Sequence, residues 1–216
     1  MKVYPADLPS ALPEAIELLK GGSLVAFPTD TVYGVAAHAF LPQAVARLYA
    51  AKERPRERAI PLLLSKEEDL PLVARDIPPI AWPLIERFWP GGLTLILFRK
   101  ATVPEIVCAG GETVALRVPD HRLALAIIEG TGAPLATTSA NLSGRPEPVT
   151  ADQVCQQLGA HIDLILDGGP SRGGISSTLV DLTLSPPAVL RKGAIAVERL
   201  AELIPNLTLS NPPRVC

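Results

Sequence analysis

The chain has 216 residues, of which 48% are hydrophobic, and a formal net charge of -2. That length is enough to bury a full core, as one large domain or two small ones, and we expect one. No stretch approaches the roughly 18 to 20 apolar residues that span a bilayer, and residues 1–13 lack the apolar region of a secretory signal. We therefore expect a cytoplasmic protein with no membrane partner.

Cysteine and histidine are few and scattered: the positions are Cys108, Cys155, Cys216, His38, His121 and His161. They show neither a C-x-x-C spacing nor the local pattern of a zinc site or a His-based triad. We therefore predict reduced thiols and no metal held directly by side chains. Aromatic residues make up only 4% of the chain, which argues against bases stacked on a row of exposed rings.

Hydrophobic periodicity and turn residues divide the chain into alternating helices and strands. Predicted helices cover residues 12–19, 42–51, 77–88, 122–129 and 197–203, and a capping box at Thr150 and Gln153 begins another. Predicted strands cover residues 24–27, 60–64, 93–98, 113–118, 132–138, 164–166, 177–181 and 188–191.

Such alternation predicts an α/β fold in which helices flank a sheet. The irregular spacing and the short strands argue against a regular doubly wound sheet, so we expect a twisted, mixed sheet of parallel and antiparallel strands. We assign residues 1–205 to a single domain and residues 206–216 to a loosely held tail. No G-x-G-x-x-G or G-x-x-x-x-G-K-[ST] motif follows any predicted strand, so dinucleotide and P-loop binding have no support.

A basic run at residues 47–58 is the first candidate for function. It contains the triplet Lys52-Glu53-Arg54 and carries five Lys or Arg residues against two glutamates. Cations concentrated in this way favour an anionic partner such as a polyphosphate or an RNA backbone. Alternatively, these residues form a solvent-exposed helix end, where cations stabilise the C-terminus of the helix.

A second polar triplet, Ser139-Ala140-Asn141, follows the predicted strand at residues 132–138. Ligands of open α/β sheets collect at the carboxyl ends of strands, although Ser, Asn and Gly are also ordinary turn residues. Each triplet lies where a predicted element ends in a loop. We therefore predict one site built from both halves of the chain.

Seven segments, which together lie within residues 12–195, closely resemble the YrdC/Sua5 family of threonylcarbamoyl-AMP synthases. These segments are residues 28–34, 52–55, 89–94, 117–119, 139–144, 177–181 and 190–193. The resemblance implies an α/β sheet with a large concave face. It also implies a nucleotidyltransferase that converts L-threonine, bicarbonate or CO2, and ATP into threonylcarbamoyl-AMP and pyrophosphate for the t6A modification of tRNA.

The same resemblance implies roles for individual residues. The catalytic, phosphate-binding group comprises Lys52, Arg54, Ser139 and Asn141, and the nucleotide is also bound by Arg58, Thr113 and Arg191. Threonine is bound by Thr31, Arg117, Thr137 and Ser177. The planar fork of Arg117 suits the α-carboxylate, but a structural ion pair is its alternative. Alternatively, Arg191 is a cation on the protein surface. The hydroxyls of the threonines and the serine could likewise form hydrogen bonds within turns and bind no ligand.

The resemblance further implies Mg²⁺ delivered with ATP, no tightly bound organic cofactor, and downstream threonylcarbamoyl-transferase proteins and tRNA as further partners. The chain departs from the family pattern at two places. Residues 56–65 lack the usual Asn-Pro-Leu stretch and the following His, which leaves the family's His contact to threonine without an assigned counterpart. Arg58 is assigned to the nucleotide contact that the family's Asn or Lys makes. Glu147 stands where many relatives have a small hydroxyl residue.

Two other functions stay open at this point. One is a non-catalytic module of the same fold that binds tRNA or ribosomal RNA. The other is an inactive paralogue, or a carbamoyl-transfer domain like that of hydrogenase maturation factors. After Arg191 the chain has room for only one helix and a tail, which resembles the short, single-domain form of the family.

Overall fold

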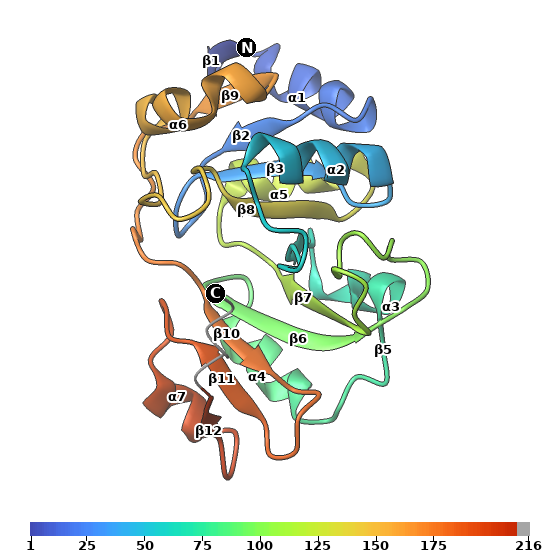
Figure 1. The fold of residues 1–216 in the computed structure, drawn as a ribbon. Coiled ribbons are helices and arrows are strands. Elements are labelled where there is room, and N and C mark those ends of the chain that lie inside the picture. Colours follow the sequence, from blue (N-terminus) through green and yellow to red (C-terminus); the bar gives the residue numbers. More distant parts are fainter. Residues whose placement is uncertain (211–216) are drawn as a thin grey trace.

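A computed structural model describes residues 1–210 of the chain (Figure 1). The helices are α1 (Ala11–Lys20), α2 (Pro42–Ala51), α3 (Leu70–Val73), α4 (Ala81–Phe88), α5 (Arg122–Thr131), α6 (Ala151–Leu158) and α7 (Val197–Ala201). The strands are β1 (Lys2–Pro5), β2 (Val25–Phe27), β3 (Gly34–His38), β4 (Leu62–Leu63), β5 (Ala74–Arg75), β6 (Leu93–Arg99), β7 (Thr113–Arg117), β8 (Leu135–Ser139), β9 (Leu164–Asp167), β10 (Thr178–Asp181), β11 (Ala188–Arg191) and β12 (Thr208–Leu209).

All of these strands join one sheet in the order β1-β9-β2-β3-β8-β4-β7-β6-β10-β11-β12, and β5 pairs with β6 beside this path. Figure 1 shows the sheet running from β1 at the top to β12 at the bottom. Parallel pairs such as β4 with β7 stand beside antiparallel pairs such as β6 with β7. The predicted mixed α/β sheet in one domain is confirmed.

Side chains along the strands alternate between two cores, because successive strand residues point to opposite faces of a sheet. Val25 and Phe27 pack with α1 and α5 on one face, whereas Leu24 and Ala26 pack on the other face with α2, α4 and α6. Burying a side chain of this size stabilises a fold by about 1.5 to 3 kcal/mol. The two apolar layers therefore hold the sheet from both sides.

Helix α2 places the first polar triplet at its C-terminal end. Pro42 occupies the first turn, where a missing N–H is tolerated, and Val45 and Leu48 face the core at helical spacing. The helix stops at Ala51, Lys52 caps it, and Glu53 has a positive φ of 50° that breaks the helical path. The packing of α2 on the sheet thus fixes where Lys52 begins.

The structure differs from the predicted elements mainly in its strands. Strands β1 and β3 were not predicted, and the helix predicted at residues 77–88 begins at Ala81. Of the predicted tail, Thr208 and Leu209 form β12, which pairs in parallel with β11, and Leu207 packs against the core. The first part of the predicted tail thus makes these contacts with the sheet and the core, and residues 211–216 lie outside the described residues.

Across residues 1–210, no helix combines the length and the apolar composition needed to cross a membrane. Cys108 and Cys155 are both free thiols, as predicted for these two positions. Burial of Cys108 raises the pKa of its thiol to about 11, so it stays protonated near neutral pH and is a poor nucleophile.

Candidate functional site

A cavity of about 490 Å³ opens on the face of the sheet that also carries α1 and α5. It lies over the central strands β3, β4, β8, β7, β6 and β10. Strand alternation explains its lining, because Leu95 and Leu116 point into the core while Thr94 and Arg117 line the cavity. This concave face has the size of an ordinary small-molecule site.

The lining is strongly basic. Its cations are Lys52, Arg54, Arg58, Arg117, Arg145 and Arg191. Among the described residues that line the cavity, Glu147 is the only carboxylate. In a chain with a net charge of -2, this concentration of positive charge favours an anionic ligand.

Lys52 joins the two polar triplets. Its side chain is buried, and its Nζ donates hydrogen bonds to the backbone oxygens of Ser139 and Asn141, at the end of β8. The backbone of Lys52 accepts a third bond from Ser143 N at 3.0 Å. The structure thus brings together residues that lie 87 and 89 positions apart.

Burial makes the charge of Lys52 unusually labile. Desolvation, with a further contribution from the positive charge of Arg54, lowers the pKa of Lys52 to about 7, and Glu147 partly opposes this shift. An anion bound beside such a lysine raises its pKa again, because a negative charge stabilises the protonated form.

Asn141 reaches the cavity with an acceptor that has no partner. Its Nδ2 donates to the backbone oxygens of Leu142 at 2.9 Å and Arg145 at 2.7 Å, which fixes the orientation of the amide. Within residues 1–210, its Oδ1 is buried without a hydrogen-bond partner, as is the Oγ of Ser143. Because unsatisfied buried polar atoms are rare in folded proteins, both atoms suggest a ligand.

Arg54 and Arg58 lie on the α2 side of the cavity. Arg54 donates to the backbone oxygens of Arg58 at 3.0 Å and Ala59 at 2.8 Å, so it holds its own loop while it lines the cavity. Arg58 is exposed at the rim.

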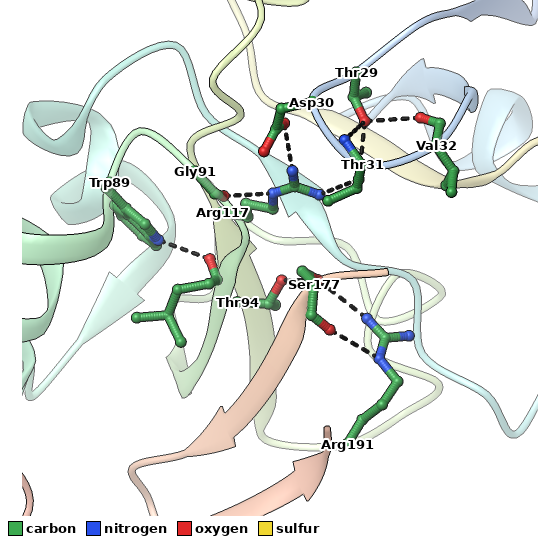
Figure 2. A network of polar contacts seen from close by, with 11 residues as sticks. Thr29, Asp30, Thr31, Val32, Trp89, Gly91, Thr94, Arg117, Ser177 and Arg191 are labelled. Carbon is green, nitrogen blue, oxygen red and sulfur yellow. Dashed lines mark hydrogen bonds and ion pairs between the residues drawn. The ribbon is translucent and has the colours of Figure 1, made fainter. Parts of the chain in front are cut away.

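Arg117, at the end of β7, is the centre of a buried network (Figure 2). Its guanidinium donates to Gly91 O at 2.8 Å and Thr31 Oγ1 at 3.0 Å, and it forms an ion pair with Asp30. These contacts use three of its five N–H groups. The predicted alternative of a structural ion pair is therefore present, and two donors have no partner in the part of the chain that the structure describes and remain for a ligand.

A second network faces it from β10 and β11 (Figure 2). Ser177 Oγ lies 2.7 Å from Thr94 Oγ1 and accepts a hydrogen bond from Arg191 at 3.1 Å. Arg191 also donates to the backbone oxygen of Ser177 at 3.1 Å. Arg191 and Ser177 thus form one unit of the cavity wall.

Thr137 lines the cavity from β8, where its hydroxyl donates to Leu135 O at 3.1 Å. Thr113 is different, because the structure does not bring it into the cavity lining. It shares a face of β7 with Ala115 and Arg117 but pairs with Phe98, at the far end of the strand. Its predicted nucleotide contact requires a ligand that extends beyond this edge.

The sequence did not assign Thr94, Arg145 or Ser176, which also line the cavity. Strand alternation could have found Thr94, the polar residue next to buried Leu93 and Leu95. Arg145 and Ser176 lie in loops and carry no comparable signal.

Comparison with known proteins agrees with this geometry. A family model described as "Telomere recombination", covering Sua5, YciO and YrdC proteins, matches residues 17–193. A threonylcarbamoyl-AMP synthase of Pyrococcus abyssi is 41% identical over 90% of the chain. A putative threonylcarbamoyl-AMP synthase of Mycobacterium tuberculosis H37Rv is 40% identical over 93% of it.

Solved structures give the same result. The crystal structure of P. abyssi Sua5 complexed with L-threonine matches 92% of the chain at a TM-score of 0.90 and 40% identity. The crystal structure of Escherichia coli YciO matches 92% at a TM-score of 0.82 and 26% identity. The chain spans 57% of the length of the P. abyssi synthase and 92% of the M. tuberculosis protein. On the match to the family model and on these relatives, the chain belongs to the Sua5/YciO/YrdC family.

Proposed function

We propose that the chain is an L-threonylcarbamoyladenylate synthase, a nucleotidyltransferase that uses L-threonine, bicarbonate or CO2, and ATP. The names of the P. abyssi and M. tuberculosis relatives support this activity. The observation that carries the proposal is the contact of Lys52 with both Ser139 and Asn141 inside one basic cavity that also holds Arg117 and Ser177.

The chemistry requires two bonds to form. The threonine amine loses a proton to water and forms an N–C bond with CO2, which gives a carbamate. A carbamate oxygen then attacks the α-phosphorus of ATP, and the bond to the departing pyrophosphate breaks. Such transfers depend mainly on positioning and on cations near the phosphates.

We assign the phosphates and the amino acid to different residues of the cavity. Lys52 and Ser139 would hold the phosphates, with Arg54, Arg58 and Arg191 adding positive charge, while the amide of Asn141 would order the adjoining backbone. The two remaining donors of Arg117 suit the threonine carboxylate, and Thr31, Thr137 and Ser177, which line the same cavity, would contact the rest of the amino acid. P. abyssi Sua5 binds L-threonine in its crystal structure, which supports a threonine pocket here.

Mg²⁺ would arrive with ATP rather than reside in the protein. Among the described residues, no group of three or more His, Cys, Asp or Glu is placed to hold a metal. The product would pass to threonylcarbamoyl-transferase proteins for tRNA modification in the cytoplasm.

The test is pyrophosphate release measured with L-threonine, bicarbonate and ATP, together with each reactant omitted in turn. Release should need all three, and Lys52→Ala should reduce it by at least about 100-fold, as expected for a residue that stabilises the transition state through its charge. Lys20→Ala, an exposed lysine on α1, is the matched control and should leave the rate unchanged. An RNA-binding module of the same fold would release no pyrophosphate, and that result would refute the proposal.

A further inference from the structure

Glu147 is a carboxylate in a cavity whose other charged lining residues are Lys and Arg. A nucleotide triphosphate needs the cations of this wall, and a carboxylate among them would repel the phosphates. Glu147 nevertheless lies near enough to Lys52 and Arg191 that its charge raises the pKa of both, although burial dominates and lowers each value overall. Its carboxylate therefore occupies the region that the phosphates would enter.

The backbone on both sides of Glu147 is held in place. Pro148 O accepts a hydrogen bond from Tyr33 N at 2.9 Å, and Val149 O accepts one from Ser171 N at 2.8 Å. On the other side, Arg145 O accepts from Asn141 Nδ2 at 2.7 Å. The position of Glu147 in the wall is thus set by the fold.

Few of the acceptor sites of this carboxylate are used. The carboxylate of Glu147 accepts a hydrogen bond from Ser176 Oγ, which lies 2.7 Å and 2.6 Å from its two oxygens. One hydroxyl donates one proton, so most of the lone pairs of the carboxylate stay available. A second oxygen, Asn141 Oδ1, belongs to a residue that lines the same cavity and is only 6% exposed, and it has no hydrogen-bond partner among residues 1–210.

A hard cation explains both observations. Phosphate oxygens accept but do not donate, so they cannot satisfy Asn141 Oδ1 or a carboxylate. Mg²⁺ prefers oxygen ligands and usually binds through one or two carboxylates together with substrate phosphates and water. An ion between Glu147 and the phosphates would turn their repulsion into attraction.

We propose that Glu147, together with Asn141 Oδ1, binds the Mg²⁺ ion that accompanies the nucleotide. The inference rests on the proposed function, since it requires ATP in this cavity. It gives this chain a protein ligand for the metal, which would make nucleotide binding dependent on Mg²⁺.

The test compares wild type with Glu147→Gln, which keeps an acceptor for Ser176 but removes the charge. ATP affinity is measured by calorimetry with excess Mg²⁺ and again with EDTA. Wild type should bind ATP far better with Mg²⁺. Glu147→Gln should bind metal-free ATP more tightly than wild type does, and the ratio of the two dissociation constants should fall at least tenfold. Equal tightening in both conditions would mean simple repulsion and would overturn the proposal.

A direct readout uses Mn²⁺ in place of Mg²⁺. The free Mn²⁺ signal in electron paramagnetic resonance gives the affinity of the ion for the protein–ATP complex, which Glu147→Gln should weaken at least tenfold. Ser176→Ala removes the hydrogen bond but keeps the carboxylate, so it should retain the wild-type Mn²⁺ affinity. An unchanged Mn²⁺ affinity in Glu147→Gln would overturn the inference alone, whereas failure of wild type to bind ATP in any condition would refute the proposed function.

Discussion

Lys52 combines burial with a role that requires charge. Its pKa is lowered to about 7, first by desolvation and then by Arg54. The unfolded chain, with a lysine pKa near 10.5, binds more protons than the folded chain between those two values. The Lys52 contribution to the free energy of unfolding therefore rises with pH across this window.

This state predicts proton uptake when ATP binds. At pH 8 most Lys52 side chains are neutral in the free protein, and the phosphates should restore the ammonium form. Calorimetry in two buffers of different ionisation enthalpy should detect uptake of up to about one proton per ATP in wild type. Lys52→Met should lose it, and retained threonine binding would show that this variant is folded. Equal proton exchange in the two proteins would contradict the assigned state of Lys52.

Asp30 should be a stability residue, because it neutralises a buried cation. The Asp30 and Arg117 side chains are 18% and 8% exposed, and removing one partner of a buried pair costs about 3 to 5 kcal/mol. Asp30→Asn should therefore lower the melting temperature by roughly 6 to 20 °C, at about 2 to 4 °C per kcal/mol for a chain of this size.

The control for Asp30 is an ion pair on the surface. Arg75 and Asp76 form a contact of 2.7 Å but are 45% and 69% exposed, and such pairs contribute about 0 to 1 kcal/mol. Asp76→Asn should shift the melting temperature by only a few degrees. The melting temperatures are measured by circular dichroism. Equal shifts for the two variants would argue against a buried Asp30–Arg117 pair.

The residue types predicted the location of the site well. They did not predict which of its residues form hydrogen bonds and ion pairs with one another. The two polar triplets were found from charge and turn chemistry, and they do share one cavity. The roles within it came from the family resemblance. The link from Arg117 to Asp30 and Gly91 spans 87 and 26 residues, and no local pattern specifies such pairings.

At the scale of elements, strands with apolar, β-branched sequences were predicted well. Strand β11 has the predicted bounds, and β7 ends one residue earlier than predicted. Strand β3 was missed because Gly34-Val35-Ala36-Ala37-His38 is rich in small residues and follows a turn-like segment. Its pairing with β2 and β8 decides its structure, and tertiary context of this kind overrides propensity.

We predict that the turn after β11 fixes the position of Ser177 and Arg191 in the cavity wall. A Cβ added at Gly193 would lie 2.2 Å from Ser176 O and 2.5 Å from the carbonyl carbon of Ser177. Because these are backbone atoms, Gly193→Ala must displace the start of β10. We expect threonine affinity, measured by calorimetry, to fall at least tenfold.

Gly110→Ala is the matched control for that prediction. Gly110 has a φ of +77°, and no atom lies within 4 Å of the added Cβ. This substitution should cost about 1 to 2 kcal/mol of stability through backbone strain and leave threonine affinity unchanged. A Gly193→Ala protein with wild-type affinity would show that the position of Ser177 does not determine binding.

At the scale of the whole molecule, the sheet order explains why the site is shared. Strands β3 and β8 belong to the half beneath α1 and α5, and β6 and β10 belong to the half that ends in β11 and β12. The two-residue strand β4 and strand β7 join these halves, and the cavity lies over this junction. Lys52 follows α2 and Asn141 follows β8 on one side of the junction, whereas Ser177 precedes β10 and Arg191 ends β11 on the other side.

The central claim is that this one cavity holds the nucleotide and the amino acid side by side. The most direct measurement is a crystal structure with L-threonine and a non-hydrolysable ATP analogue. The account predicts phosphates against Lys52 and Ser139, and the threonine carboxylate on Arg117, with the α-phosphorus facing the amino acid. Ligands bound at separate places, or a nucleotide outside the cavity, would contradict it.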